Sequence, residues 1–481
     1  MSLTLRPFPL FTQIYLQPPP CTHSQPLVTV QAEMGRNTNS EPSLERRNMK
    51  NVLLLGVSFL LVFTAFQTMG NIQQTLVQSI QSEYEKENKT DFAGANGYTS
   101  QSIIYASFAV FNWIAPSVVS VIGPKMSMFL GSIPYALFVG SFLIPMTWLL
   151  YLTSAILGFG AAVIWTGQGN YLTLCSNDAT MTRNSGIFWA LMQSSFLIGN
   201  IFVFFVFAGA DTISYDIRMV TVGVLFGVGA LGTLFILFLN NLSNSSEGRK
   251  ETSALGAFKN SVSLFFTKEM LLLSLTFAYT GISLSFLAGV YSTCIGNTLA
   301  FGDMAKQLVG LSGMFIGVGE IVGGLLFSIF GKKTARWGQD PIVLFGFVTH
   351  VVGFFIVFLN IPADANMGPT DTEAFITPNA FLAIFCSFLI GFGDSCFNTQ
   401  IYSLIGIMYS EDSAPAFMLF KFVQSIASAI SFFYTPYTSV HIQLLIIGIL
   451  AFSGTVTFWI VCFLRKRSLA NSNSTIAIST E

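Results

Sequence analysis

Charged side chains are scarce in this chain. Only 9% of its 481 residues are Asp, Glu, Lys or Arg, whereas an average soluble domain has about 25%. So little charge cannot cover the surface of an ordinary soluble fold. The net charge of −1 also gives no basic surface of the kind that binds nucleic acid, so we expect no nucleic-acid partner.

Cysteine and catalytic motifs are scarce as well. The six cysteines form no CxxC pair, so we expect no disulfide framework and no metal site. No P-loop, HExxH or GxSxG pattern is present, and we expect neither an enzyme nor a cofactor. Glycines recur at helical spacing without a preceding strand, which predicts close-packing helix surfaces at Gly310, Gly313, Gly317, Gly324, Gly223 and Gly227.

Long apolar runs fill most of the chain. Hydrophobic residues make up 52% of it and 49 residues are Phe, so the lipid bilayer is the expected environment. Windows of about 19 residues predict spans near 50–70, 99–122, 127–146, 149–171, 186–209, 219–239, 270–291, 306–330, 341–360, 379–402, 414–436 and 440–464. The predicted fold class is an all-α integral membrane protein with twelve transmembrane helices.

Polar stretches divide the chain into five parts. We expect a disordered cytoplasmic segment at 1–48, a six-helix half at 49–239, a cytoplasmic connector at 240–269, a second six-helix half at 270–464 and a cytoplasmic tail at 465–481. Within the connector, residues 255–266 have the pattern of an amphipathic surface helix.

The basic residues predict the orientation. With the N-terminus in the cytoplasm, 17 of the 22 Lys and Arg residues fall on the inside and four outside, as the positive-inside rule requires. Asn88 begins the sequence Asn-Lys-Thr in the first outside loop, where glycosylation would occur. Both termini are expected to be cytoplasmic. The sequence leaves open whether the membrane is the plasma membrane or an endolysosomal one.

A faint internal repeat relates the two sets of spans. Four matches recur in the same order: residues 53–59 with 271–277, Gly158-Phe159-Gly160 with Gly391-Phe392-Gly393, Gln193-Ser194 with Gln424-Ser425, and Gly123 with Gly331. Equivalent helices then have the same topology number in each half. The repeat therefore predicts two parallel pseudo-repeats of six helices, the arrangement of the major facilitator superfamily.

Three runs resemble a particular family. The segments 63–71 (FTAFQTMGN), 116–119 (PSVV) and 183–195 (RNSGIFWALMQSS) are similar to the uncoordinated-93-like family of the major facilitator superfamily, above all its orphan major-facilitator-domain-containing branch. The resemblance covers residues 50–465. It implies a twelve-span fold, with relatives regarded as solute transporters, as a potassium-channel regulator and as a trafficking chaperone for immune receptors.

The chain departs from the wider superfamily at the inside gate. The usual motif between helices two and three is reduced to Gly123-Pro124-Lys125, and only Gly331-Lys332-Lys333 and Arg336 resemble it in the second half. The motif's Asp, which helps to latch the inside gate of coupled transporters, is absent from both. This absence favours a role other than alternating access.

Three charged residues lie deep in predicted spans, all in the second half: Glu320, Asp394 and Lys421. A charge within the hydrocarbon costs about 2.5–3.5 kcal/mol by insertion scales and is a functional candidate by default. We hypothesise that Lys421 pairs with Asp394, which leaves Glu320 free to exchange a proton. The alternatives are that Lys421 extends to the interface and that the two acids form a structural pair or polar cap.

The first half carries amides instead of charges. Gln67, Asn71, Gln74 and Gln78 share one helical stripe, and Gln101, Tyr105, Phe108 and Asn112 repeat that spacing in the second span. Gln168 and Asn170, in the fourth span, and Gln193 and Asn200, in the fifth, complete the set. These amides predict either a site for a polar or zwitterionic solute or hydrogen bonds between helices.

Two functions remain open from the sequence. The first is a secondary transporter that moves a small polar solute by alternating access, with proton coupling through Glu320. The second is a non-transporting regulator or trafficking partner of other membrane proteins. Candidate solute-binding or coupling residues are Glu320, Asp394, Lys421, Gln67, Asn71, Asn112, Gln168 and Gln193.

Overall fold

The computed structural model describes residues 41–176, 180–208, 213–242, 254–329, 339–409 and 413–479. Within these ranges the regular structure is helical, with one isolated parallel bridge between Thr298 and Thr370. The body of the molecule comprises residues 48–481. The disordered segment predicted at 1–48 lies outside the described residues as far as residue 40. From Glu41 the chain is already helical, so the predicted boundary is too late.

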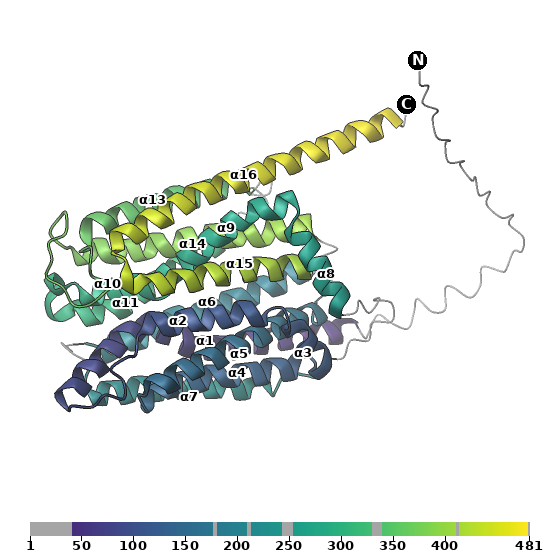
Figure 1. The fold of residues 1–481 in the computed structure, drawn as a ribbon. Helices are drawn as coiled ribbons and strands as arrows, with labels where there is room; N and C mark the ends of the chain where they lie inside the picture. Colours follow the sequence, from purple (N-terminus) through teal and green to yellow (C-terminus); the bar gives the residue numbers. More distant parts are fainter. Residues whose placement is uncertain are drawn as a thin grey trace, which may run out of the picture. The chain divides into compact units, whose positions relative to one another are not determined.

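The helices run lengthwise through the body (Figure 1). The first seven are α1 (Glu41–Lys86), α2 (Gly97–Phe111), α3 (Ala115–Ile122), α4 (Pro124–Gly140), α5 (Thr147–Leu174), α6 (Met181–Val206) and α7 (Tyr215–Ile236). The rest are α8 (Ala254–Phe265), α9 (Lys268–Ser285), α10 (Tyr291–Asn297), α11 (Ala305–Ile329), α13 (Asp340–Asn360), α14 (Ala380–Met408), α15 (Ser413–Tyr434) and α16 (Val440–Ser479). The helix predicted in the connector at 255–266 corresponds to α8.

Eleven helical segments of the described chain are long and apolar enough to cross a membrane. The second predicted span, 99–122, is instead a bent pair in which α2 and α3 meet at 68°. If this pair counts as one span, the described chain has up to twelve candidate spans. Pro116 is the second residue of α3, and a proline has no N–H to bond the carbonyl four residues earlier, here that of Asn112. The break at Asn112–Ile114 therefore has a local cause.

The first predicted span is too short. The span was predicted near 50–70 and a helical stripe as far as Gln78, whereas α1 continues to Lys86. This extension is not a solvated arm, because Ile72, Leu76 and Ile80 are buried. Apolar residues at helical spacing thus continue well beyond the 19-residue window that defined the span.

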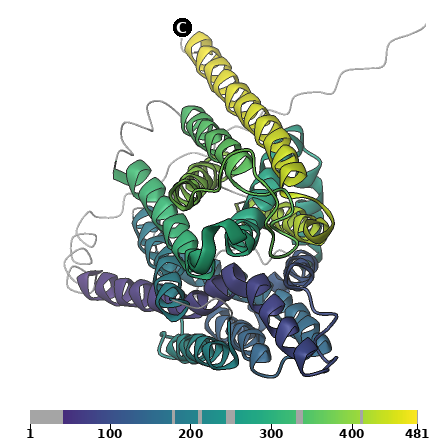
Figure 2. The ribbon, with the colours of Figure 1, turned by 90° about the vertical axis from the view of Figure 1, so that its left-hand side faces the viewer.

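The buried apolar side chains form two large clusters. One consists of residues between Val52 and Leu239 together with Val309, and the other of residues between Met270 and Cys462 together with Tyr98 and Phe196. In end view the purple and blue helices gather on one side and the green and yellow ones on the other (Figure 2). The exact boundaries of the two predicted halves remain a proposal.

Glycines set the contact between α6 and α11. A Cβ at Gly310 would lie 2.6 Å from Phe204 N, and one at Gly313 would lie 2.3 Å from Asn200 Cγ. Such close approach is what small residues permit between membrane helices. The same interpretation is wrong for Gly223 and Gly227, which have nothing within 4 Å of an added Cβ. On α7, Gly229 and Gly232 contact α1 instead, at Ala65 and Val62.

Candidate functional site

Glu320 meets Gln193 where α11 packs against α6. The Glu320 side chain is buried, and Gln193 Nε2 donates a hydrogen bond to its Oε2 at 2.5 Å. One turn away, Gly317 approaches Leu197, where an added Cβ would lie 3.1 Å from the backbone nitrogen. The glycine thus brings the helices close enough for an amide of the first predicted half to reach a carboxylate of the second.

Asp394 lies on α14, the other helix that packs closely on α11. At Gly323 of α11 an added Cβ would meet Ser395 Cβ at 2.8 Å. Asp394 is buried and accepts a hydrogen bond from Asn398 Nδ2 at 2.8 Å through Oδ2, while its Oδ1 is buried without a partner. The carboxyl groups of Glu320 and Asp394 are near enough to interact electrostatically.

Lys421 does not form the predicted ion pair. No salt bridge joins it to Asp394 or Glu320 among the described residues; its Nζ donates to Gln424 Oε1 at 2.9 Å. An amide one turn along the same helix satisfies the ammonium without any movement of α15 toward α14. Lys421 nevertheless lies within electrostatic range of Asp394, so its charge still acts on the acids.

Aromatic rings lie on the same helix faces as these polar groups. The Lys421 ammonium is 4.8 Å from the centre of the Phe420 ring and 5.5 Å from that of Tyr402. The Tyr402 ring is 5.5 Å from Trp189, which lies one turn before Gln193 and stacks on Trp165. We call Trp165, Trp189, Tyr402 and Phe420 the ring cluster.

The amide stripe of α1 is engaged in contacts between segments. Gln67 accepts from Ser195 Oγ at 2.6 Å, and Asn71 donates to Asn200 at 2.7 Å and to the Val309 carbonyl at 3.2 Å. Gln74 accepts from the Gly97 amide at 2.7 Å, and Gln78 donates to the Met367 carbonyl at 3.4 Å. These bonds match the packing alternative and join α1 to α2, α6, α11 and the segment between α13 and α14.

Two predicted residues lie apart from the acids. Asn112 follows α2 at the bend, and its Nδ2 is buried without a partner. Gln168 is buried in α5, and its side chain forms no hydrogen bond within the described part of the chain. The geometry therefore brings Gln193, Glu320, Asp394 and Lys421 into one region and leaves Asn112 and Gln168 outside its hydrogen bonds.

Sequence reasoning missed several residues of this region. Asn398 follows Asp394 by four positions, the spacing that places two side chains on one helix face, so the pair was detectable. Trp189 and Tyr402 could not be found this way, because aromatic residues are common throughout the chain. His350 is also buried, and it bonds to Tyr279 and to the Ile390 carbonyl.

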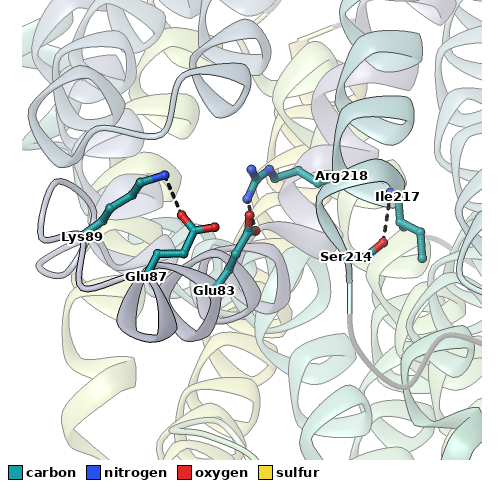
Figure 3. Close-up of polar contacts among 6 residues, drawn as sticks. All are labelled: Glu83, Glu87, Lys89, Ser214, Ile217 and Arg218. Carbon is teal, nitrogen blue, oxygen red and sulfur yellow. Dashed lines mark hydrogen bonds and ion pairs between the residues drawn. The ribbon is translucent and has the colours of Figure 1, made fainter.

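At the far end of α1 lies a buried ion pair. Figure 3 shows Glu83 of α1 pointing to Arg218 of α7, at 2.8 Å, with Arg218 only 3% exposed. Nearby, Lys89 pairs with Glu87 at 2.6 Å, and this hydrogen bond raises the pKa of Lys89. Asn88, the predicted glycosylation site, is exposed in the turn between them.

These features define a class. The helices, their glycine contacts and the buried polar region between them are those of a multi-pass membrane protein with the major facilitator fold. The nucleoside transporter NupG superposes with a TM-score of 0.59 at 14% identity, over 84% of this chain and 99% of that one. The peptide transporter POT in complex with sulfate gives 0.60 at 13% identity, over 87% and 94%.

The sequence comparisons are more specific. The family model described as "Ion channel regulatory protein UNC-93" matches residues 89–459, and the chain belongs to the UNC-93 family. The UNC93-like protein MFSD11 of Xenopus laevis is 44% identical over 452 residues, which cover 89% of this chain and 100% of that protein. The predicted resemblance and fold class are confirmed. The family description names ion-channel regulation and no enzyme activity.

Proposed function

We propose that this protein is a secondary transporter that moves a small polar solute by alternating access, with Glu320 as the group that couples transport to protons. One observation carries the proposal: Gln193 of the first predicted half donates to a buried carboxylate of the second. Deep acids without an ion-paired base are rare in membrane helices and are typical of proton and solute pathways.

The contact gives the coupling a physical basis. If the halves separate at this level, Glu320 loses the donor that supports its charged form and meets water instead. The proton occupancy of Glu320 then depends on the conformation, and by reciprocity the conformation depends on the proton. The second acid, Asp394, keeps Asn398 in either state, because both residues belong to α14.

The test compares metabolites between cells that lack the protein and cells that overexpress it, followed by uptake of each candidate into proteoliposomes. We expect uptake of at least one candidate to follow an imposed proton gradient. In Glu320→Gln that dependence should disappear, whereas Glu269→Gln, an acid at the start of α9, should keep it. Unchanged gradient dependence in Glu320→Gln contradicts the coupling role, and absence of uptake for every candidate contradicts transport.

A second candidate is a regulator of other membrane proteins. The family description names ion-channel regulation, and the inside-gate Asp of coupled transporters is absent from residues 123–125. A regulator would change the current of a co-expressed channel whether or not Glu320 is intact. Full regulation by Glu320→Gln, without solute uptake by the wild-type protein, would favour this function.

We further propose that both termini face the cytoplasm and that Asn88 is glycosylated on the opposite side. The bias of 17 basic residues against four and the exposed position of Asn88 support this orientation. Cleavage of tags at either terminus in intact and permeabilised cells tests it: protection in intact cells is expected at both ends.

A further inference from the structure

The charges around Glu320 do not balance. Glu320 interacts electrostatically with Asp394, and Asp394 with Lys421; when both acids are ionised, two carboxylates with one ammonium leave one negative charge. Tyr279 and Cys396 also lie near Asp394, but neither carries a positive charge. His350 is held between Tyr279 and the Ile390 carbonyl. In the described part of the chain, no Lys, Arg or His forms a salt bridge with either acid.

One polar atom at this site lacks a partner. Asp394 Oδ1 is buried and accepts no hydrogen bond, although its side chain is only 6% exposed. A buried carboxylate oxygen without a donor lacks the hydrogen bonds that water would give it, and this destabilises its charged form. A ligand that brings one N–H donor and one positive charge would satisfy both the unbalanced charge and the unpaired oxygen.

The ring cluster indicates what kind of cation fits. Lys421 already rests against Phe420 and Tyr402 with the geometry of a cation–π contact. The Tyr402 ring continues to Trp189 and Trp165, and Trp189 lies one turn before Gln193, which bonds Glu320. Small inorganic cations prefer several oxygen ligands, which aromatic rings do not supply. An ammonium attached to an apolar body matches acids and rings together.

We propose that the Glu320–Asp394 pair binds a small organic cation of charge +1, with its ammonium at the carboxylates and its apolar body on the ring cluster. The transport of this cation rests on the proposed function, but its binding does not. A single proton would neutralise the same negative charge. Proton and cation therefore compete for the site, which makes the solute an exchange partner of the proton.

The experiment measures thermal unfolding of the purified full-length protein with three probes of similar shape: 2-phenylethylamine, 2-phenylethanol and 3-phenylpropionate. We expect only the amine to raise the Tm, in a saturable manner and with higher affinity at pH 8 than at pH 6. Glu320→Gln and Asp394→Asn should each weaken its Kd at least about tenfold, whereas Glu269→Gln should not. If either acid variant fails to fold, Trp189→Ala, which removes only a ring, should still weaken the Kd.

Each outcome decides the inference. The inference is overturned if the amine does not raise the Tm, or if the alcohol or the carboxylate raises it as much as the amine does. It is also overturned if NaCl, compared with KCl and without any amine, raises the Tm as much as the amine does. Retained affinity in both acid variants also overturns it. Binding of the amine without uptake into proteoliposomes supports the site but contradicts the proposed transport. Uptake of an uncharged solute without amine binding supports the proposed transport but contradicts the cation site.

Discussion

Opening of the bundle at the end that holds Tyr98 should depend on a single hydroxyl group. Tyr98, at the start of α2, is 2% exposed, and its hydroxyl donates to the Asn366 carbonyl at 3.0 Å. Asn366 belongs to the segment between α13 and α14, and its own Nδ2 bonds to the carbonyls of Thr435 and Thr438 at 2.6 and 2.9 Å. Tyr98 thus ties the first predicted half to a segment fixed on the second.

Tyr98→Phe removes this bond and little else. A hydrogen bond of this kind contributes about 0.5–1.5 kcal/mol net, so its loss should shift a closed–open equilibrium about 2- to 12-fold toward opening. Gln78, which reaches the neighbouring Met367 carbonyl at the longer distance of 3.4 Å, should retain part of the closure. The expected result is a partial shift rather than a permanently open state.

Cys294 supplies a built-in reporter. It is buried and lies beside Tyr98, so a membrane-impermeant thiol reagent should reach it only when this end opens. In a protein whose other cysteines are replaced, we expect the reagent to label Cys294 about 2- to 12-fold faster when Tyr98→Phe is added, in line with the hydrogen-bond energy. Tyr151→Phe is the matched control, because the Tyr151 hydroxyl donates to Gly94 within the first predicted half. Equal labelling rates in the Tyr98 variant and its parent, or equal acceleration in the control, would refute the reasoning.

Three further predictions concern stability and modification. Gly313→Ala should lower the Tm, because its Cβ would lie 2.3 Å from Asn200, whereas Gly223→Ala, with open space around it, should not; equal effects would contradict the packing argument. Glu83→Gln should cost about 1.5–3 kcal/mol in thermal unfolding by removing a charge from buried Arg218, and an unchanged Tm would show the pair to be unimportant. Asn88→Gln should abolish the mobility shift that an N-glycosidase produces in wild type; no shift in wild type would be the contrary result.

Much of the fold could be predicted because hydropathy depends on local sequence alone. The windows located the helices, and the connector helix followed from its amphipathic pattern. The sequence predicted a helical stripe as far as Gln78 but not the extension of α1 to Lys86, and the groups that Gln73, Gln74 and Gln78 bond, on Ser100, Gly97 and Met367, lie on other segments. Only the folded chain supplies those partners. Pro116 could have indicated the bend at Asn112–Ile114, but the hydropathy is high across the bend, so the windows predicted one continuous span.

The site was less predictable than the fold. Its acids stood out because charge in an apolar span is rare, but their partners depend on helix rotation and on contacts between distant segments. Lys421 therefore turned out to bond Gln424 rather than Asp394, and Gln193 rather than a base was found at Glu320. The glycines that set the α6–α11 approach were recognised, yet which side chains they would bring together could not be derived from spacing.

The asymmetry of the two predicted halves suggests why the link at Glu320 is an amide. Removal of one partner from a buried ion pair costs about 3–5 kcal/mol, whereas a hydrogen bond to a single charged group contributes about 1.5–3 kcal/mol. Gln193 can therefore release Glu320 at a lower cost than a base could. Gln193→Lys should supply the missing positive charge, hold α6 against α11 and occupy the place of a cation. We expect a higher Tm and no further stabilisation by 2-phenylethylamine, with Gln193→Met as the uncharged control. A Gln193→Lys protein that binds the amine with wild-type affinity would show that the negative charge at Glu320 and Asp394 is not what attracts it.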